Sequence, residues 1–259
     1  MTDQLQIENH AYWMWRARGY SEVNQEELAG IQRATWSRLL DEVISSHPAC
    51  KGKAKQEIRI LDIGCGPGFL SIILTELGYR VTSGDFASSM LEQAKINATI
   101  LADQMDFRIE NAMDLSFADE TFNVVLSRNL TWNLPDPKRA YEEWLRVLRP
   151  GGLLLVFDAN WYGYLRDDDH RKAYEADRAN VAKAGCGDYD IGENFEIMED
   201  IAESLPLTGM NRPDWDARVF LKFGITSFEV THDIGAFVYS EKEKINYASN
   251  PMFMIKVVK

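Results

Sequence analysis

The stretch that decides the fold runs from Leu61 to Phe69 and reads Leu-Asp-Ile-Gly-Cys-Gly-Pro-Gly-Phe. An apolar, strand-like run at 58–61 precedes it, and an apolar, helix-like run at 70–77 follows it. Glycines in such a turn let the backbone bend sharply and approach a ligand, while the start of the next helix offers free N–H groups and a positive dipole end. The stretch therefore predicts a nucleotide-cofactor loop.

Two details separate this loop from a dinucleotide site. Its glycines follow the pattern G-x-G-x-G, with Pro67 between the last two, rather than the G-x-G-x-x-G that holds a pyrophosphate. Asp62 stands two residues before the first glycine. A carboxylate at the mouth of the loop would repel a pyrophosphate and attract an ammonium or sulfonium group. For the loop taken alone, a tight turn that binds no ligand is the alternative.

Strand and helix patterns alternate on both sides of this loop. Strand patterns lie at 59–63, 80–83, 107–110, 122–127 and 152–158, and helix patterns lie at 70–77, 88–102 and 137–148. Continuous apolar runs such as 153–157 are typical of strands covered on both faces. The order predicts an α/β fold with a parallel, doubly wound sheet, and further patterns predict a helix at 214–223 and strands at 227–231 and 252–258.

The flanking segments predict the domain organisation. An amphipathic helix is expected at 24–44, followed by a polar linker at 45–57. The stretch 160–212 is too long for an ordinary connection and carries a helical pattern at 171–184, so we expect a cap over a substrate pocket. The predicted parts are an N-terminal helical lid and linker at 1–57, a cofactor-binding core at 58–159, a cap insertion at 160–212 and a C-terminal helix and strands at 213–259.

Composition narrows the function class. The chain has 259 residues, of which 46% are hydrophobic and 26% charged, as is ordinary for a globular protein. Its net charge of −12 and the lack of a basic stripe oppose binding to nucleic acid. No run is apolar enough for a membrane span or a signal core, so we expect a cytoplasmic protein without a membrane partner. Cys50, Cys65 and Cys186 have no C-x-x-C spacing, which indicates neither a disulfide framework nor a zinc site.

Polar residues follow the predicted strands at the edge where open parallel sheets bind ligands. Asp85 ends the second strand 21 positions after Gly64, which is the spacing at which an acid accepts hydrogen bonds from ribose hydroxyls. A solvated helix cap is its alternative role. The segments 110–117 and 127–136 follow the third and fourth strands, so they belong to the same candidate site.

As an ordered set, the motifs between Ile58 and Asp158 resemble class I S-adenosylmethionine-dependent methyltransferases, in the methyltransferase domain 11/25-like small-molecule subgroup. The segment 110–117 is similar to the family's G-D-A-x-x-L-P-F, 127–136 to its S-R-N-x-x-W-H-L-P-D, and 149–152 to its L-K-P-G-G turn. The resemblance implies a seven-stranded sheet with an antiparallel last strand. It also implies transfer of a methyl group from S-adenosylmethionine to a small molecule by in-line displacement, giving S-adenosylhomocysteine.

The resemblance and the strand ends together predict a set of cofactor-binding residues. They are Arg16, Tyr20, Asp62, Gly64, Cys65, Gly66, Asp85, Phe86, Met90, Asn111, Ala112, Met113, Arg128 and Asn129. Asn111 departs from the family, which has an acid at this position that accepts a hydrogen bond from the adenine amino group. An amide oxygen also accepts such a hydrogen bond, but more weakly than a carboxylate. No catalytic residue is assigned, because alignment of the reactants supplies much of the rate in this chemistry.

Aromatic residues supply the candidate substrate pocket, which we predict to include Tyr12, Trp15, Trp132, Asn160, Trp161 and Tyr162. The stretch 12–20 resembles a lid in which Arg16 pairs with the cofactor carboxylate, or it is an N-terminal helix that packs its aromatic rings on the core. Asp158, His170 and His232 are possible proton acceptors, and none has a spacing that singles it out.

Three alternatives stay open. The acidic run 167–169 with His170 could hold a hard divalent cation, but we favour an N-terminal cap on the helix at 171–184, so no metal is predicted. On a related sheet, the chain could be a nicotinamide-dependent oxidoreductase. It could also be a noncatalytic protein that binds S-adenosylmethionine and transfers nothing.

Overall fold

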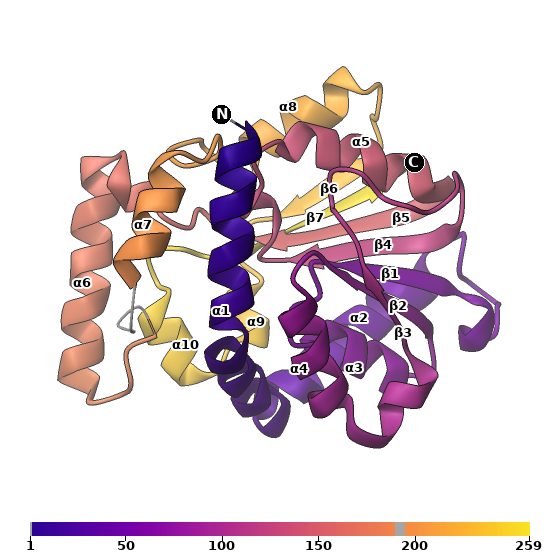
Figure 1. The fold of residues 1–259 in the computed structure, drawn as a ribbon, viewed down its shortest axis with the longest axis horizontal. Helices are drawn as coiled ribbons and strands as arrows, with labels where there is room; N and C mark the ends of the chain where they lie inside the picture. The colour runs from indigo at the N-terminus through magenta and orange to yellow at the C-terminus, as the bar shows by residue number, and fades with distance from the viewer. Residues whose placement is uncertain (1, 190–194) are drawn as a thin grey trace.

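The computed structural model describes residues 2–189 and 195–259, and its centre is a seven-stranded sheet of order β3-β2-β1-β4-β5-β7-β6 (Figure 1). The strands are β1 (Arg59–Ile63), β2 (Arg80–Asp85), β3 (Asp106–Ile109), β4 (Phe122–Arg128), β5 (Leu148–Asp158), β6 (Phe228–Thr231) and β7 (Phe253–Val258). Strands β1 to β5 pair in parallel, whereas β7 pairs antiparallel with both β5 and β6. The predicted doubly wound sheet with an antiparallel last strand is confirmed.

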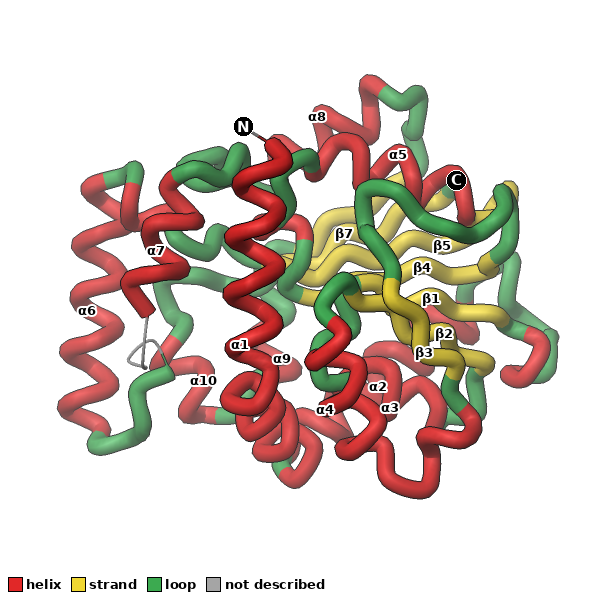
Figure 2. The backbone as a smooth tube through the Cα atoms, in the orientation of Figure 1, coloured by secondary structure: helices red, strands yellow, loops and turns green. Residues whose placement is uncertain are grey.

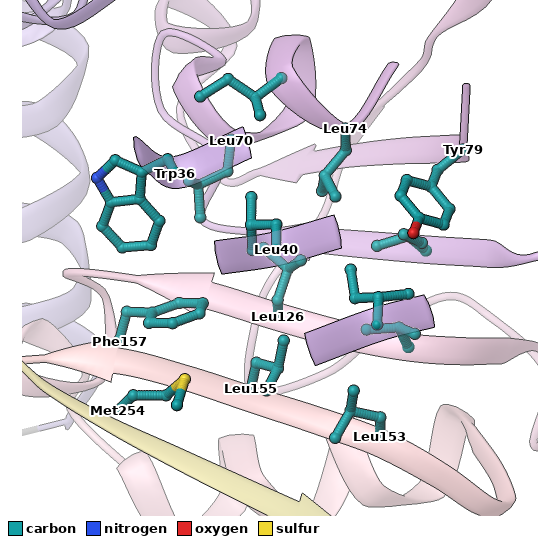
Figure 3. Packing of buried hydrophobic residues seen from close by; sticks show 14 of the residues in the cluster. Trp36, Leu40, Leu70, Leu74, Tyr79, Leu126, Leu153, Leu155, Phe157 and Met254 are labelled. Carbon is teal, nitrogen blue, oxygen red and sulfur yellow. The ribbon is translucent and has the colours of Figure 1, made fainter. Parts of the chain in front are cut away.

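Helices cover both faces of this sheet, as Figure 2 shows. On one face lie α2 (Ile31–Ser46), α3 (Phe69–Glu76) and α4 (Ser88–Ala98), and on the other lie α5 (Pro137–Val147) and α8 (Asp214–Lys222). In the first layer Trp36 of α2 and Leu70 of α3 pack with Leu126 and Phe157 of the sheet (Figure 3). Because the central strands are buried from both sides, they read as continuous apolar runs in the sequence.

The N-terminal segment differs from the prediction. Instead of one helix at 24–44, the chain forms a 28-residue α1 (Thr2–Ala29) and a separate α2, which meet at Gly30. Helix α1 stands across the carboxyl ends of the parallel strands (Figure 1) and contacts α4 and α7 (Phe195–Glu203). The aromatic side chains of α1 lie on several faces of the helix, because α1 packs against neighbours on more than one side. Its sequence therefore has no single apolar stripe from which the helix could be predicted. The aromatic stretch 12–20 is therefore helical.

The segment predicted as a cap is mostly helical where it is described. It contains a 3-10 turn (Gly163–Leu165), α6 (Asp168–Ala184) and α7, and residues 190–194 of that prediction, like Met1 of the predicted lid, lie outside the described residues. Helices α6 and α7 lie on the far side of α1 from the sheet (Figure 1). The Asp167 carboxylate accepts hydrogen bonds from the backbone N–H groups of Asp169 and His170, which confirms the helix-cap alternative.

Smaller differences concern the ends of elements. Helix α4 ends at Ala98 rather than at 102 and continues as a 3-10 helix (Thr99–Gln104), and further 3-10 turns lie at Lys55–Glu57 and Thr131–Asn133. Two short helices, α9 (Gly235–Val238) and α10 (Glu241–Asn246), lie between β6 and β7 and were not predicted. Within the described ranges, no helix combines the length and the apolar character needed to cross a bilayer.

Candidate functional site

One cavity lies at the carboxyl ends of the parallel strands beneath α1, with a volume of about 1010 Å³ counted to its open mouth. Thirteen of the fourteen predicted cofactor residues line it: Tyr20, Asp62, Gly64, Cys65, Gly66, Asp85, Phe86, Met90, Asn111, Ala112, Met113, Arg128 and Asn129. Arg16 is the exception. The predicted residues thus meet in one place, although they come from α1, α4 and the ends of four strands.

The glycine loop is shaped by backbone conformations that other residues rarely adopt. Gly64, Gly66 and Gly68 have φ angles of 68°, 53° and 92°. A Cβ on Gly64 would lie 2.6 Å from Cδ2 of Leu130, so a larger residue would also collide with the β4 loop. The N–H groups of Gly64 and Cys65 both donate to the carbonyl of Gly84, at 2.8 and 3.0 Å, which ties the loop to β2.

Asp85 holds this loop in place as well as facing the cavity. Its Oδ2 accepts a hydrogen bond from the N–H of Gly66, and its Oδ1 accepts one from the N–H of Ala87, both at 2.9 Å. Burial raises the pKa of the Asp85 carboxyl to about 6. Each oxygen keeps a further lone pair, so the carboxylate could serve a ligand without losing its backbone contacts. Phe86 beside it is 41% exposed and packs 4.7 Å from the ring of His10.

Asp62 lies at the base of the cavity and is only 1% exposed, which corrects the expectation that it stands at the mouth of the loop. The Ser71 hydroxyl donates to Asp62 Oδ2 at 2.6 Å, and the Ser83 hydroxyl donates to Ser71 Oγ at 2.8 Å. Burial, and to a smaller extent the nearby Asp85, raise the pKa of Asp62 to about 7. Among the described residues no ion pair to Asp62 is present, so a positively charged ligand group would be stabilised beside this buried acid.

After β3, the side chain of Asn111 supports its own turn, because its Oδ1 accepts a hydrogen bond from the N–H of Met113 at 3.0 Å. The indole N–H of Trp144 donates to the carbonyl of Ala112 at 3.0 Å. Glu110 also lines the cavity, and its carboxylate accepts a hydrogen bond from the N–H of Ser116 at 2.9 Å. Glu110 was not predicted, although its place at the end of the third strand pattern was a usable signal.

Arg128 joins the sheet to α1 through a buried ion pair with Glu27. Burial disfavours the charged guanidinium, but Glu27 overcomes this and raises the pKa of Arg128 above its usual value. The side-chain amide of Asn24 donates to Glu27 at 3.0 Å, and the guanidinium lies 4.6 Å from the ring centre of Phe69. This ion pair fixes the C-terminal part of α1 against the cavity.

Fourteen further residues line the cavity that the sequence did not single out. Five lie on α1, namely Gln6, Asn9, His10, Trp13 and Asn24. The other nine are Ile63, Phe69, Leu70, Ala87, Glu110, Leu130, Asn133, Leu134 and Pro135. The lining positions on α1 recur at helical spacing. A helix predicted over the whole N-terminal segment would have placed these positions on one face.

The six predicted substrate-pocket residues lie outside the lining of this cavity, and some of them lie next to it. Trp15 is 48% exposed, and Tyr12, Trp132, Trp161 and Tyr162 belong to an apolar cluster with residues of α7. Asn160 and Trp161 line a second cavity that His170 also borders. The indole N–H of Trp132 donates to the carbonyl of Asn129 at 3.0 Å, and that of Trp161 donates to Asn129 Oδ1 at 3.3 Å, so both contact a residue of the lining. Their role in a substrate pocket stays a prediction.

The three candidate proton acceptors lie outside the lining of the cavity. Asp158 is fully buried, accepts a hydrogen bond from Arg212 Nη1 at 2.7 Å, and accepts another from the N–H of Trp132 at 3.0 Å. Burial raises its pKa, and Arg212 opposes that rise. Both His170 and His232 are exposed. Asp158 is therefore engaged in holding the loop after β4.

Comparisons with known proteins agree with this architecture. Residues 61–156 match the family model described as a methyltransferase domain. A ubiquinone biosynthesis O-methyltransferase of Parvibaculum lavamentivorans is 33% identical over 105 residues, which are 40% of this chain and 42% of that protein. The match therefore spans about two fifths of the length of this curated relative.

Solved structures resemble the chain over a longer range. A putative S-adenosylmethionine-dependent methyltransferase of Methanococcus maripaludis superposes with a TM-score of 0.56 at 18% identity, covering 92% of this chain and 91% of that one. A phosphoethanolamine N-methyltransferase of Haemonchus contortus, solved with S-adenosylmethionine, gives 0.55 at 17% identity over 85% of this chain and 52% of that one. These structures share the fold. Within that shared fold, residues 61–156 of this chain match the methyltransferase-domain family.

Proposed function

We propose that this protein is an S-adenosylmethionine-dependent methyltransferase that acts on a small-molecule acceptor. The observation that carries the proposal is the pairing, in one cavity, of the glycine loop with two acids, the buried Asp62 and the half-buried Asp85. A cofactor with ribose hydroxyls and two cationic groups matches this combination, because it donates hydrogen bonds and brings positive charge to acids whose pKa values burial has raised.

The residues in the cavity fit such a cofactor. Gly64 and Gly66 place no side chain at two positions of the loop that line the cavity, and a Cβ on Gly66 would come into van der Waals contact with the Tyr20 ring, at 3.5 Å. Asp85 has lone pairs left for ribose hydroxyls, and Asp62 offers a buried carboxylate to a cation. Phe86, Ala112 and Met113 supply apolar surface for the adenine. When bound, the cofactor supplies a methyl group on a sulfonium that is ready for displacement.

The chain's own contribution is to align the reactants and exclude water. Helix α1 covers the cavity, and its Glu27–Arg128 ion pair holds that cover in place. A fixed arrangement of this kind lowers the entropic part of the barrier, which is worth on the order of 7 to 11 kcal/mol in well-oriented systems. We extend the proposal to the parts of the chain, with 1–57 as lid, 58–159 as cofactor-binding core and 160–212 as cap.

The test is transfer of a labelled methyl group. The purified protein is incubated with S-[methyl-³H]adenosylmethionine and a panel of phenols, alcohols, amines and thiols, and S-adenosylhomocysteine is measured by chromatography. We expect the product to form with at least one acceptor and to disappear in the Gly64→Val variant, whose side chain collides with Leu130. If the wild-type protein binds the cofactor tightly and forms product with no acceptor, the noncatalytic alternative is favoured instead.

A further inference from the structure

Three polar atoms in the wall of the cavity are buried and have no hydrogen-bond partner among the described residues. They are Oδ1 of Asn9, Oδ1 of Asn133 and Nε1 of Trp13, and all three residues line the cavity. Asn9 is 7% exposed and Asn133 is 5% exposed. A buried polar group without a hydrogen-bond partner lowers the stability of the folded protein by about 1 to 3 kcal/mol. Three such groups in one wall therefore indicate a ligand that forms hydrogen bonds with them.

The Asn9 amide and the backbone of Asn133 are held in position by contacts that leave these atoms unpaired. Nδ2 of Asn9 donates to the backbone carbonyl of Asn133 at 2.6 Å, which fixes the orientation of the Asn9 amide and leaves its oxygen unpaired. The backbone N–H of Asn133 donates to the carbonyl of Leu130 at 3.0 Å. Asp158 holds the same short 3-10 turn by accepting the N–H of Trp132. Two carbonyl-type acceptors therefore face the cavity, one on an amide held by a hydrogen bond and one on a turn whose backbone is held.

The charges around the cavity restrict what this wall accepts. Asp62, Asp85 and Glu110 line the cavity, whereas Arg128 is the one Lys or Arg in the lining and is already paired with Glu27. A carboxylate or phosphate on an acceptor that brings no cation of its own, unlike the cofactor with its ammonium and sulfonium, would meet these acids without a free guanidinium or ammonium in the lining to offset them. A hydroxyl group suits the wall, because it donates to an amide oxygen and accepts from an indole N–H.

Resting on the proposed function, we propose that Asn9, Trp13 and Asn133 form the acceptor subsite and select an uncharged, hydroxyl-bearing molecule against carboxylated and phosphorylated ones. The three residues come from α1 and from the turn after β4, whereas the residues proposed for the ribose and the adenine follow β1, β2 and β3. The subsite therefore sets specificity separately from cofactor affinity.

The test measures binding to protein saturated with S-adenosylhomocysteine. Isothermal titration compares catechol with 3,4-dihydroxybenzoate, glycerol with glycerate, and glucose with glucose 6-phosphate. We expect the uncharged member of at least one pair to bind at least tenfold more tightly than its anionic partner. Equal or tighter binding by the anionic members, or no binding by any uncharged member, overturns the proposal.

Variants separate this subsite from the cofactor site. Asn9→Leu and Asn133→Leu each remove an acceptor oxygen, and Trp13→Phe removes only the indole N–H while keeping a ring. We expect each to weaken the uncharged ligand at least tenfold while the dissociation constant for S-adenosylhomocysteine stays within twofold. Gln4→Leu is the matched control, because this α1 amide is exposed and bonds only within the helix, to Glu8.

The outcomes distinguish the two proposals. If wild-type protein does not bind S-adenosylhomocysteine, the proposed function fails. If the wild-type protein binds it but Asn9→Leu or Trp13→Phe loses it tenfold, these atoms serve the cofactor and only the acceptor subsite is refuted. Should the leucine variants not fold, Trp13→Phe alone decides, since unchanged binding of the uncharged ligand would then contradict the proposal.

Discussion

Replacement of Arg212 by methionine tests how the end of the predicted cap is joined to the sheet. Arg212 is 3% exposed, and its guanidinium donates to Asp158 at 2.7 Å and to both oxygens of Asp216 at 2.8 and 3.0 Å. Arg212→Met would leave two fully buried carboxylates without their cation. Breaking such a pair costs about 3 to 5 kcal/mol in unfolding free energy.

The assay is urea unfolding followed by intrinsic fluorescence, together with a thermal scan. A loss of this size corresponds to a fall in Tm on the order of 6 to 20 °C for a chain of this length. The matched control is Arg18→Met, which breaks an exposed ion pair with Glu22 and is expected to change stability by less than about 0.5 kcal/mol. Because removal of the cation favours protonated carboxyls, the loss should also be larger at pH 8 than at pH 5.

A triple variant tests whether the unpaired buried charges cause the loss of stability. When Asp158→Asn and Asp216→Asn are added to Arg212→Met, no buried charge is left, and we expect much of the lost stability to return. An Arg212→Met variant that loses less than about 1 kcal/mol would refute the reasoning, since the carboxylates would then not depend on Arg212.

Three further predictions concern the cavity. Asp85→Ala should weaken binding of S-adenosylhomocysteine by about 1 to 3 kcal/mol in a calorimetric titration, and an unchanged dissociation constant would remove Asp85 from the site. Gly64→Ala forces a left-handed residue against Leu130 and should cost at least about 1 to 2 kcal/mol in unfolding free energy, whereas Gly151→Ala, which meets nothing within 4 Å, should cost only the backbone term. The pKa of Asp62, about 7 when folded against 3.8 ordinarily, means that the folded state binds more protons than the unfolded state between about pH 4 and 7, so the unfolding free energy falls as pH rises through this window. Asp62→Asn should flatten that decline in denaturation curves measured at pH 5 and pH 8, and an equal slope in both proteins would contradict it.

The parts of the fold that local pattern determines were predicted from the sequence. The apolar run at 153–157 and the glycines after Asp62 specify a buried strand and a strand-to-helix loop by themselves, and the structure has both. Strand-end residues such as Asp85 could be placed because parallel strands deliver their carboxyl ends to one edge.

Other features depend on contacts between distant segments. The bounds of helix α1 were not predicted because its rings contact several neighbours: an N-terminal helix was only one of two interpretations of the stretch 12–20, and the cavity-lining Asn9 was not named. The bond between Arg212 and Asp158 joins positions 54 residues apart, and nothing in the local sequence of either indicates the partner. The depth of Asp62 likewise depends on packing by residues from other elements.

The most direct test of the central claim is calorimetric titration of the wild-type protein with S-adenosylmethionine, S-adenosylhomocysteine and NAD. The account predicts that the two adenosyl compounds bind with one-to-one stoichiometry and compete for one site, and that Gly64→Val abolishes both. Preferential binding of NAD, or no heat of binding with either adenosyl compound, would contradict it.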